Sequence, residues 1–255
     1  GRLGDFGISP THPLLDALEM DGDTVTVRRS LSLATDPWIL DHAIDGKPVL
    51  PGVIGLELMA AAAMIADPGN RYIGAENVQY LAPVKLHGDS PTDVIVRATP
   101  VDGGVRASLS SSRQTRTGRV IETDHFSAEI RWAMGAHSAL PPMGMPDHPV
   151  SAEAIYKRFF HGPIFQVLGS ATASTSDALL ADGSVRHTSI TGGLLTIPLV
   201  LEAAFQAAGL HRMMVDGVMA LPQAIQSVLI LGSVRDDEAL KLTVRRDGSA
   251  YDVDV

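Results

Sequence analysis

Apolar and polar residues alternate in several segments of the chain, which is the pattern of β-strands that bury one face. The first clear segment is TVTVRRSLSL, at Thr24–Leu33. Similar segments occur at Asp93–Val101, Gly104–Ser112 and His125–Trp132. The last three segments follow one another along the chain, and we expect them to form a run of antiparallel strands.

One long segment has no such alternation. Residues Gly52 to Ala66 are apolar except for Glu57, are rich in alanine, leucine and methionine, and follow Pro51. This composition predicts a helix with Pro51 available as its first residue. A helix that is apolar on all sides must be buried on all sides. We therefore expect a single helix enclosed by a strongly curved antiparallel sheet.

The same order of elements repeats in the second half of the chain. The stretch from Ala133 to Ser151 is dense in proline, glycine and methionine and has no periodicity, so it is typical of a linker. Beyond the linker, the predicted elements are a short segment at 152–160, a strand at 165–175, a loop at 188–198, a second apolar helix at 199–215, and strands at 227–234 and 239–246.

This repetition predicts an α+β fold of two weakly similar halves, each a sheet around a buried helix. The predicted units are residues 1–134 and 152–255, joined by a linker at 135–151. Each predicted helix contains a single acid. Glu57 follows His42 by 15 residues, and Glu202 follows His187 by the same interval.

Composition limits the classes of function. The 255 residues carry a formal charge of -9, so we expect no general binding to nucleic acid or anionic membranes. The absence of cysteine excludes disulfides and thiolate metal sites and fits a reducing compartment, so we expect a cytoplasmic protein. The longest apolar run is too short to span a bilayer. Because the chain starts at Gly1 and stops within a strand-like pattern, we expect a domain excised from a longer protein.

Acid–base chemistry is suggested by three side chains. Glu202 and Gln206 stand four residues apart and share one helix face. Burial raises the pKa of a carboxyl group, so we expect Glu202 to be a neutral acid whose direction Gln206 fixes. His42, in a loop before the first helix, is the natural general base, and the Gly52 N–H at the start of that helix could hold a carbonyl oxygen. Such a set suits proton abstraction beside a carbonyl followed by protonation of a leaving hydroxyl.

Structural explanations for the same residues remain open. His42 could cap the helix, and Glu202 with Gln206 could be a hydrogen-bonded pair at a helix contact. The other histidines follow no motif and are expected at the surface or in loops: His12, His87, His125, His137, His148 and His211. No metal-binding or nucleotide-binding motif occurs in the sequence, so we predict neither a metal nor another cofactor.

In the first half, DHAIDGKPVLPG contains His42, Gly46 and Pro51 in the pattern H-x-x-x-G-x-x-x-x-P. This motif resembles that of dehydratase domains of polyketide and multifunctional fatty acid synthases. HPLLDA, at residues 12–17, resembles the usual start of such domains.

The second half carries the rest of the resemblance, in the order of the family. FFHGPIFQVLG resembles the Y-G-P-x-F-Q segment, LEAAFQ takes the place of the D-x-x-x-Q motif through Glu202 and Gln206, and LPQAIQSVLIL resembles the strand that follows. In FFHGPIFQVLG the matching residues are Gly162, Pro163, Phe165 and Gln166.

The resemblance implies a double hotdog fold and the removal of water from a 3-hydroxyacyl thioester on acyl carrier protein. It implies His42 as base, Glu202 as acid and a substrate carried on a phosphopantetheine arm, with no other cofactor. It also implies a homodimer, or docking on neighbouring synthase domains, and an apolar tunnel beside the two helices. The residues expected to contact substrate are Gly46, Pro51, Gly52, His161, Phe165 and Gln206.

Two residues depart from the family pattern. Glu202 replaces the usual aspartate, as in single-hotdog dehydratases, and in this respect the chain is similar to iterative synthases of the polyunsaturated or enediyne kind. His161 stands where many relatives carry tyrosine, which places an imidazole near the expected substrate.

Other functions remain open. One is a dehydratase that also shifts the double bond, and another is a catalytically silent hotdog domain retained for dimerisation or carrier-protein docking. A thioesterase or an aromatic-synthase template domain is a weaker alternative. The equal spacings also allow a second, degenerate site formed by His187 and Glu57.

Overall fold

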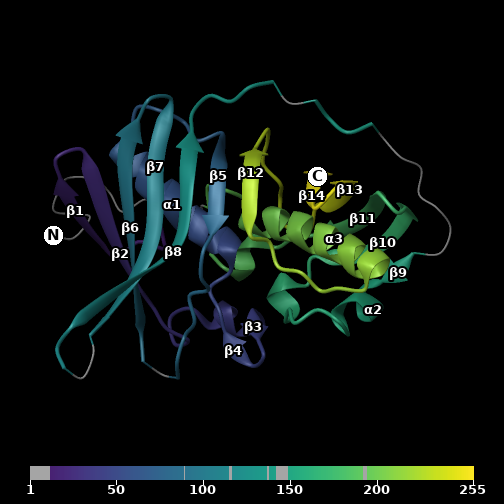
Figure 1. The fold of residues 1–255 in the computed structure, drawn as a ribbon, viewed down its shortest axis with the longest axis horizontal. Coiled ribbons are helices and arrows are strands. Elements are labelled where there is room, and N and C mark those ends of the chain that lie inside the picture. The colour runs from purple at the N-terminus through teal and green to yellow at the C-terminus, as the bar shows by residue number, and fades with distance from the viewer. Residues whose placement is uncertain (1–11, 89, 115–116, 137, 142–148, 192–193) are drawn as a thin grey trace.

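The computed structural model describes residues 12–88, 90–114, 117–136, 138–141, 149–191 and 194–255. Within these ranges the chain forms two large antiparallel sheets and one two-stranded sheet. Neither large sheet closes on itself, and each has one long helix against it (Figure 1). The seven-stranded sheet contains, in spatial order, β1 (Ala17–Asp21), β2 (Thr24–Leu31), β6 (Thr92–Val101), β7 (Gly104–Gln114), β8 (Val120–Arg131), β5 (Gly74–Tyr80) and β12 (Ala224–Leu229). The five-stranded sheet contains β14 (Ala250–Asp254), β13 (Ala239–Asp247), β11 (Ala178–Ser184), β10 (Leu168–Thr175) and β9 (Val150–Ser151).

The first central helix, α1 (Gly52–Ala66), has the bounds predicted from the sequence. Every residue from Val53 to Ala63 is buried, as expected for a helix that is apolar all round. At Gly55 an added Cβ would lie 2.3 Å from the Phe126 ring of β8. The small residue therefore lets the helix pack directly on the sheet.

The second central helix, α3 (Pro198–Asp216), lies against the five-stranded sheet, and a short helix, α2 (Ala152–Tyr156), precedes that sheet's longer strands (Figure 1). Pro198 opens α3, where its missing N–H costs no hydrogen bond. Gly217 ends the helix in a left-handed conformation, and its N–H bonds to the Met213 carbonyl.

The two halves of the chain are joined by more than the linker. Strand β12 belongs to the second half of the sequence but pairs with β5, with Ile225 opposite Val78, and so completes the first sheet (Figure 1). The α1 and α3 helices also contact one another. The predicted unit boundaries at 134 and 152 stay a prediction, and part of the predicted linker, 142–148, lies outside the described residues.

A short hairpin separates the first strands from α1. Its strands are β3 (Ala43–Ile44) and β4 (Lys47–Pro48). The connecting residues Asp45 and Gly46 both have positive φ, at 51° and 71°. Two such residues form the tight turn that suits a hairpin, and an Asp–Gly pair is among its preferred sequences. Gly46 of the motif therefore has a backbone reason to be glycine.

The predicted α+β architecture is confirmed, whereas one prediction about side chains is wrong. His125 and His211 are buried within β8 and α3 rather than lying at the surface or in loops. His12 lies in a loop before β1, as predicted, but is buried as well. His87 is exposed as expected, whereas His137 and His148 lie outside the described residues. No helix among the described residues is long and apolar enough to cross a membrane.

Candidate active site

His42 is held by its own loop. The residue follows the 3-10 helix η2 (Pro37–Asp41) as its C-cap. Its N–H donates to the Ile39 carbonyl, and its carbonyl accepts from the Val49 N–H. The Nδ1 atom of the ring lies 2.9 Å from the Val49 carbonyl oxygen. A carbonyl oxygen only accepts hydrogen bonds, so Nδ1 carries the proton of the neutral ring. The lone pair on Nε2 is therefore free to accept a proton.

The electrostatic surroundings of His42 favour the neutral ring. Burial lowers the pKa of His42, and the nearby Glu202 carboxyl raises it by a smaller amount. The net pKa is below the ordinary value, so the imidazole can accept a proton near neutral pH. The ring centroids of Phe160 and Phe165 lie 5.1 and 5.5 Å from that of His42, and both rings pack against the imidazole.

Glu202 lies on α3 and is buried. Its Oε1 atom accepts a hydrogen bond from Gln206 Nε2 at 2.9 Å and lies 3.0 Å from His161 Nε2. Burial raises the pKa of Glu202, but the hydrogen bond and charge of His161, together with His42 and Gln206, lower it, and the net direction is downward. The expectation of a raised pKa is wrong because it considered the apolar helix and not the imidazoles that face it.

Gln206 is fixed on every side. Its Nε2 also donates to the Phe165 carbonyl at 2.8 Å, and its Oε1 accepts from the Tyr156 hydroxyl at 2.8 Å. The same hydroxyl accepts from the Leu168 N–H at 2.7 Å. An amide held by three partners cannot rotate freely, so it presents its N–H to Glu202 in one direction.

His161 brings the loop of the second half against the loop of the first. An isolated antiparallel bridge joins His42 to His161, and the Gly162 N–H donates to the Asp41 carbonyl at 2.7 Å. At Gly162 an added Cβ would lie 2.5 Å from the Asp41 Oδ1 and 2.8 Å from the Asp41 Cα. The glycine of the H-G-P segment therefore permits the close approach of the two loops.

The result is a cluster of His42, His161 and Glu202. Each offers one ring nitrogen or carboxylate oxygen, and these atoms all lie within 4.8 Å of one another. Two imidazoles and a carboxylate at this spacing can exchange protons with a molecule between them, and the same spacing fits a bound cation. The predicted absence of a metal stays a prediction.

Gly52, the predicted carbonyl-binding residue, is the first residue of α1, directly after Pro51. Among the described residues, no side chain caps this end of the helix. An added Cβ at Gly52 would lie 2.6 Å from Cε1 of Tyr80 on β5. The Tyr80 hydroxyl is buried without a hydrogen-bond partner among the described residues. Burial raises the pKa of Tyr80, and the negative charge of Glu202 raises it further by a smaller amount.

Phe165 is fully buried in the short helix η3 (Pro163–Phe165). The structure therefore brings His161, Phe165, Glu202 and Gln206 together around His42. Gly46 lies in the hairpin turn, where its positive φ explains why the position is occupied by glycine. The sequence did not indicate Tyr80, Tyr156 or the Val49 carbonyl. Tyr80 and Tyr156 lie near Glu202 and Gln206, which are distant in the sequence, whereas the contact of the Val49 carbonyl with His42 depends on the hairpin between them.

Glu57, the acid of the first helix, has a different environment. Its Oε1 accepts from the Leu195 N–H at 2.7 Å and lies 2.6 Å from His12 Nε2. Its Oε2 accepts from the Thr196 N–H at 2.7 Å and from the Thr196 hydroxyl at 2.5 Å. These four partners occupy the usual acceptor positions of a carboxyl group. The postulated pairing of Glu57 with His187 stays without a hydrogen bond in the described residues, since neither ring nitrogen of His187 has one.

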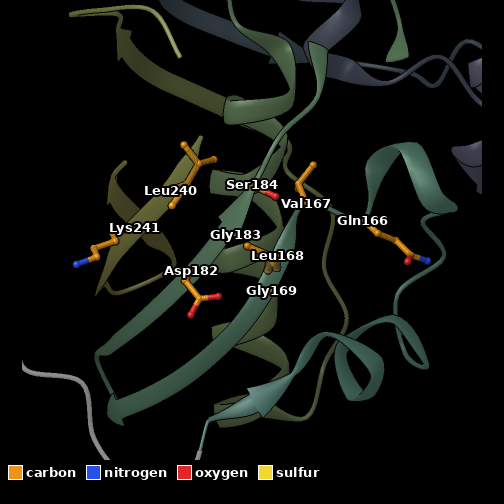
Figure 2. Close-up of a pocket in the computed structure, with 10 residues that line it drawn as sticks. Gln166, Val167, Leu168, Gly169, Asp182, Gly183, Ser184, Leu240 and Lys241 are labelled. Carbon is orange, nitrogen blue, oxygen red and sulfur yellow. The ribbon is translucent and has the colours of Figure 1, made fainter. Parts of the chain in front are cut away.

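A hollow of about 500 Å³ lies at the five-stranded sheet, lined by residues of β10, β11 and β13 and by Gln166 and Val167 before them (Figure 2). A second hollow, of about 190 Å³, adjoins it at Gln166 and Val167. Neither is lined by His42 or Glu202, so the predicted tunnel beside the helices stays a prediction. Gln166 links this region to the cluster, because its Nε2 donates to the His161 carbonyl at 3.0 Å.

Comparisons with known proteins show which family this chain resembles. Residues 12–112 match the family model described as a polyketide synthase dehydratase domain. The chain is 23% identical, over 88% of its length, to a polyunsaturated fatty acid synthase of Thraustochytrium sp.. It is 30% identical, over 83% of its length, to polyketide synthase GfsB of Streptomyces halstedii. The match covers 8% of the first protein and 4% of the second, so the chain spans less than a tenth of either.

Solved structures have the same fold. The dehydratase domain of the CurF module of curacin polyketide synthase gives a TM-score of 0.76 at 13% identity, covering 95% of this chain and 92% of that one. A structure from work on dehydratase substrate selection in the borrelidin and fluvirucin polyketide synthases gives 0.75 at 22% identity, covering 98% and 90%. The chain is therefore similar over most of its length to polyketide synthase dehydratase domains and has their double hotdog fold, as the sequence resemblance predicted.

Proposed function

We propose that this chain removes water from a 3-hydroxyacyl thioester carried on the phosphopantetheine arm of an acyl carrier protein, giving the 2-enoyl thioester. The observation that carries the proposal is the meeting of His42 from one half with Glu202 from the other, with nitrogen and oxygen atoms within 4.8 Å. A base and an acid at that spacing can serve adjacent carbon atoms of one substrate.

The base in the proposed reaction is His42. Its Nε2 takes the proton from C2 of the acyl chain, and the electron pair of that bond forms the C2–C3 double bond. The C3–O bond breaks, and the leaving hydroxyl takes a proton from an acidic group at the Glu202 end of the cluster. Water then departs. The lowered pKa of His42 supports its role, because a neutral ring is needed at the start.

Binding roles are proposed for the residues around the pair. The Gly52 N–H, at the positive end of α1, would hold the thioester oxygen while charge develops on it. Gln206 would orient Glu202, and Phe165 and His161 would wall the acyl chain. Pro51 would fix the entry of α1 next to the His42 loop, and Gly46 its hairpin.

Partners follow from the same proposal. Relatives are large synthases of which this chain matches a small part, so we propose acyl carrier protein and neighbouring synthase domains as partners, with a homodimer as the assembly. The similarity to a polyunsaturated fatty acid synthase supports an iterative synthase as the parent.

The test is to incubate the domain with 3-hydroxyacyl carrier proteins of several chain lengths and both hydroxyl configurations, and to follow loss of water by mass. His42→Ala should lower the rate by about 100- to 10,000-fold, the range for loss of a general base. His87→Ala, at an exposed histidine, is the matched control and should leave the rate unchanged. Absence of dehydration by wild type with every substrate would contradict the proposal and favour a silent domain. A shifted double bond in the product would identify an isomerase.

A further inference from the structure

His161 and Glu202 form a buried pair, and the proposed function gives His161 no part in proton transfer. Their side chains are 5% and 6% exposed, and Nε2 of His161 lies 3.0 Å from Oε1 of Glu202. An oxygen and a ring nitrogen at that distance share a proton, whichever atom holds it. On the other side of the ring, Nδ1 is buried and has no hydrogen-bond partner among the described residues. A buried polar atom without a partner needs an explanation, and a substrate oxygen is one.

We propose that His161 delivers the proton to the departing hydroxyl and that Glu202 holds the charged imidazole in place. This inference rests on the proposed dehydration and names the acid within it. In the charged ring, Nε2–H donates to Glu202 and Nδ1–H faces the leaving oxygen. As the C3–O bond breaks, the Nδ1–H bond breaks too, the proton joins the hydroxyl, and His161 is left neutral. His42 meanwhile has gained the C2 proton, so the site as a whole neither gains nor loses protons while water and the enoyl thioester form.

The surroundings of His161 suit a cation. The Phe160 ring stacks on it, with centroids 4.1 Å apart and an angle of 26°, and the Phe159 ring lies 5.6 Å away. Aromatic faces attract cations, and both rings keep the imidazole in one orientation. The other titratable groups that face the pair are His42, Tyr80 from β5 and Tyr156 from α2.

The alternative is that Glu202 itself delivers the proton and His161 only positions it. Both described hydrogen bonds to Glu202 reach Oε1, so Oε2 is the atom that would then meet the substrate. His161→Gln separates the two possibilities, because its amide can still donate to Glu202 but has no proton to transfer. His161→Tyr is the companion variant, since it restores a hydroxyl that can give up a proton.

The experiment measures kcat and KM across pH for wild type, His161→Gln and His161→Tyr, in the presence of a chelator. His161→Gln should lower kcat about 100-fold, with little change in KM, and should remove or move the decline of kcat at high pH. His161→Tyr should retain more activity than His161→Gln, with that decline moved upward, because a phenol ordinarily loses its proton near pH 10. A glutamine variant with wild-type kcat and an unchanged profile would overturn the inference and leave the dehydratase proposal intact. Inactive wild type would overturn both.

A measurement on unaltered protein covers the case in which the variants fold poorly. Nitrogen-15 NMR of labelled histidines should show the His161 ring losing a proton at the pH where kcat declines. A His161 ring that stays neutral throughout the active pH range would overturn the inference.

Discussion

The two central helices each carry one buried glutamate, and the two glutamates differ in how their oxygens are used. Glu57 on α1 accepts hydrogen bonds at both oxygens and has four partners, three of them in the segment Leu195–Thr196. Glu202 on α3 has two partners among the described residues, both at Oε1, and one of them is an imidazole of the cluster.

The difference separates a structural acid from one available for chemistry. Glu57 ties α1 to the segment that leads into α3, next to Ile197, whose φ of 44° is unusual for a β-branched residue. Glu202 instead faces two histidines, and its pKa is lowered by them. Identical spacing from a histidine in the sequence therefore does not predict an identical role.

The largest expected effect on stability is that of removing the Glu57 carboxyl. Glu57→Ala should cost roughly 3–5 kcal/mol, because it leaves buried N–H and hydroxyl donors without acceptors. Glu57→Gln should cost less, about 1–3 kcal/mol, since one amide hydrogen would meet a backbone donor. Denaturant unfolding measures each cost. Glu76→Ala, which breaks a partly exposed ion pair with Arg131, is the control and should cost under about 1 kcal/mol. Equal costs at the two positions would contradict the structural role of Glu57.

A smaller loss is expected at the contact between the two loops. Gly162→Ala places a Cβ against the Asp41 backbone, so the loops must separate, with a cost of about 1–3 kcal/mol and a fall in turnover. Gly232→Ala adds the same atom in open space and is the matched control. If both variants behave alike, the close approach of the loops does not position the cluster.

The next prediction concerns His42 and the dependence of kcat/KM on pH, whose acid-side decline should be shifted to lower pH. Its pKa is below the ordinary 6.5, so the ring of the folded protein stays neutral to lower pH than in an unfolded chain. The acid-side decline of kcat/KM should therefore have its midpoint below pH 6.5, as measured with saturating and limiting carrier-protein substrate. The lowered pKa of His42 also stabilises the folded state at pH values above 6.5. This contribution is lost as the pH falls from 6.5 through the lowered pKa. A midpoint above 6.5 would exclude His42 as the base.

The smallest expected effect is at His187. Because Glu57 already has four partners, a second acid–base site there has no available acid. His187→Ala should leave turnover within about twofold of wild type and change stability by about 0.5 kcal/mol or less. A large loss of turnover in this variant, with folding intact, would revive the second site.

The sequence predicted the secondary structure best where a single local segment determines the bounds of an element. The bounds of α1 follow from an apolar run after Pro51 that only Glu57 interrupts, and α3 begins and ends within a residue of its predicted limits. Strands β5 and β11 were not predicted, because their apolar and polar residues do not alternate regularly. The pairing of β12 with β5 joins segments far apart in sequence, which no local pattern specifies.

The same limit applies to the candidate site. His42, Glu202 and Gln206 were predicted, since their motifs are local and resemble those of the family. The direction of the Glu202 pKa could not be predicted, because it depends on His161, which the fold delivers from another loop. The acceptor role of Glu57 depends likewise on residues well over a hundred positions away.

The most direct test of this comparison is the rate of water loss from a 3-hydroxyacyl carrier protein by Glu202→Gln and Glu57→Gln, each expressed per folded molecule. We expect Glu202→Gln to lose about 100- to 10,000-fold in turnover while remaining folded. We expect Glu57→Gln to unfold more readily but to turn over within about tenfold of wild type once folded. Wild-type turnover in Glu202→Gln, or an equal collapse of both folded variants, would contradict the account.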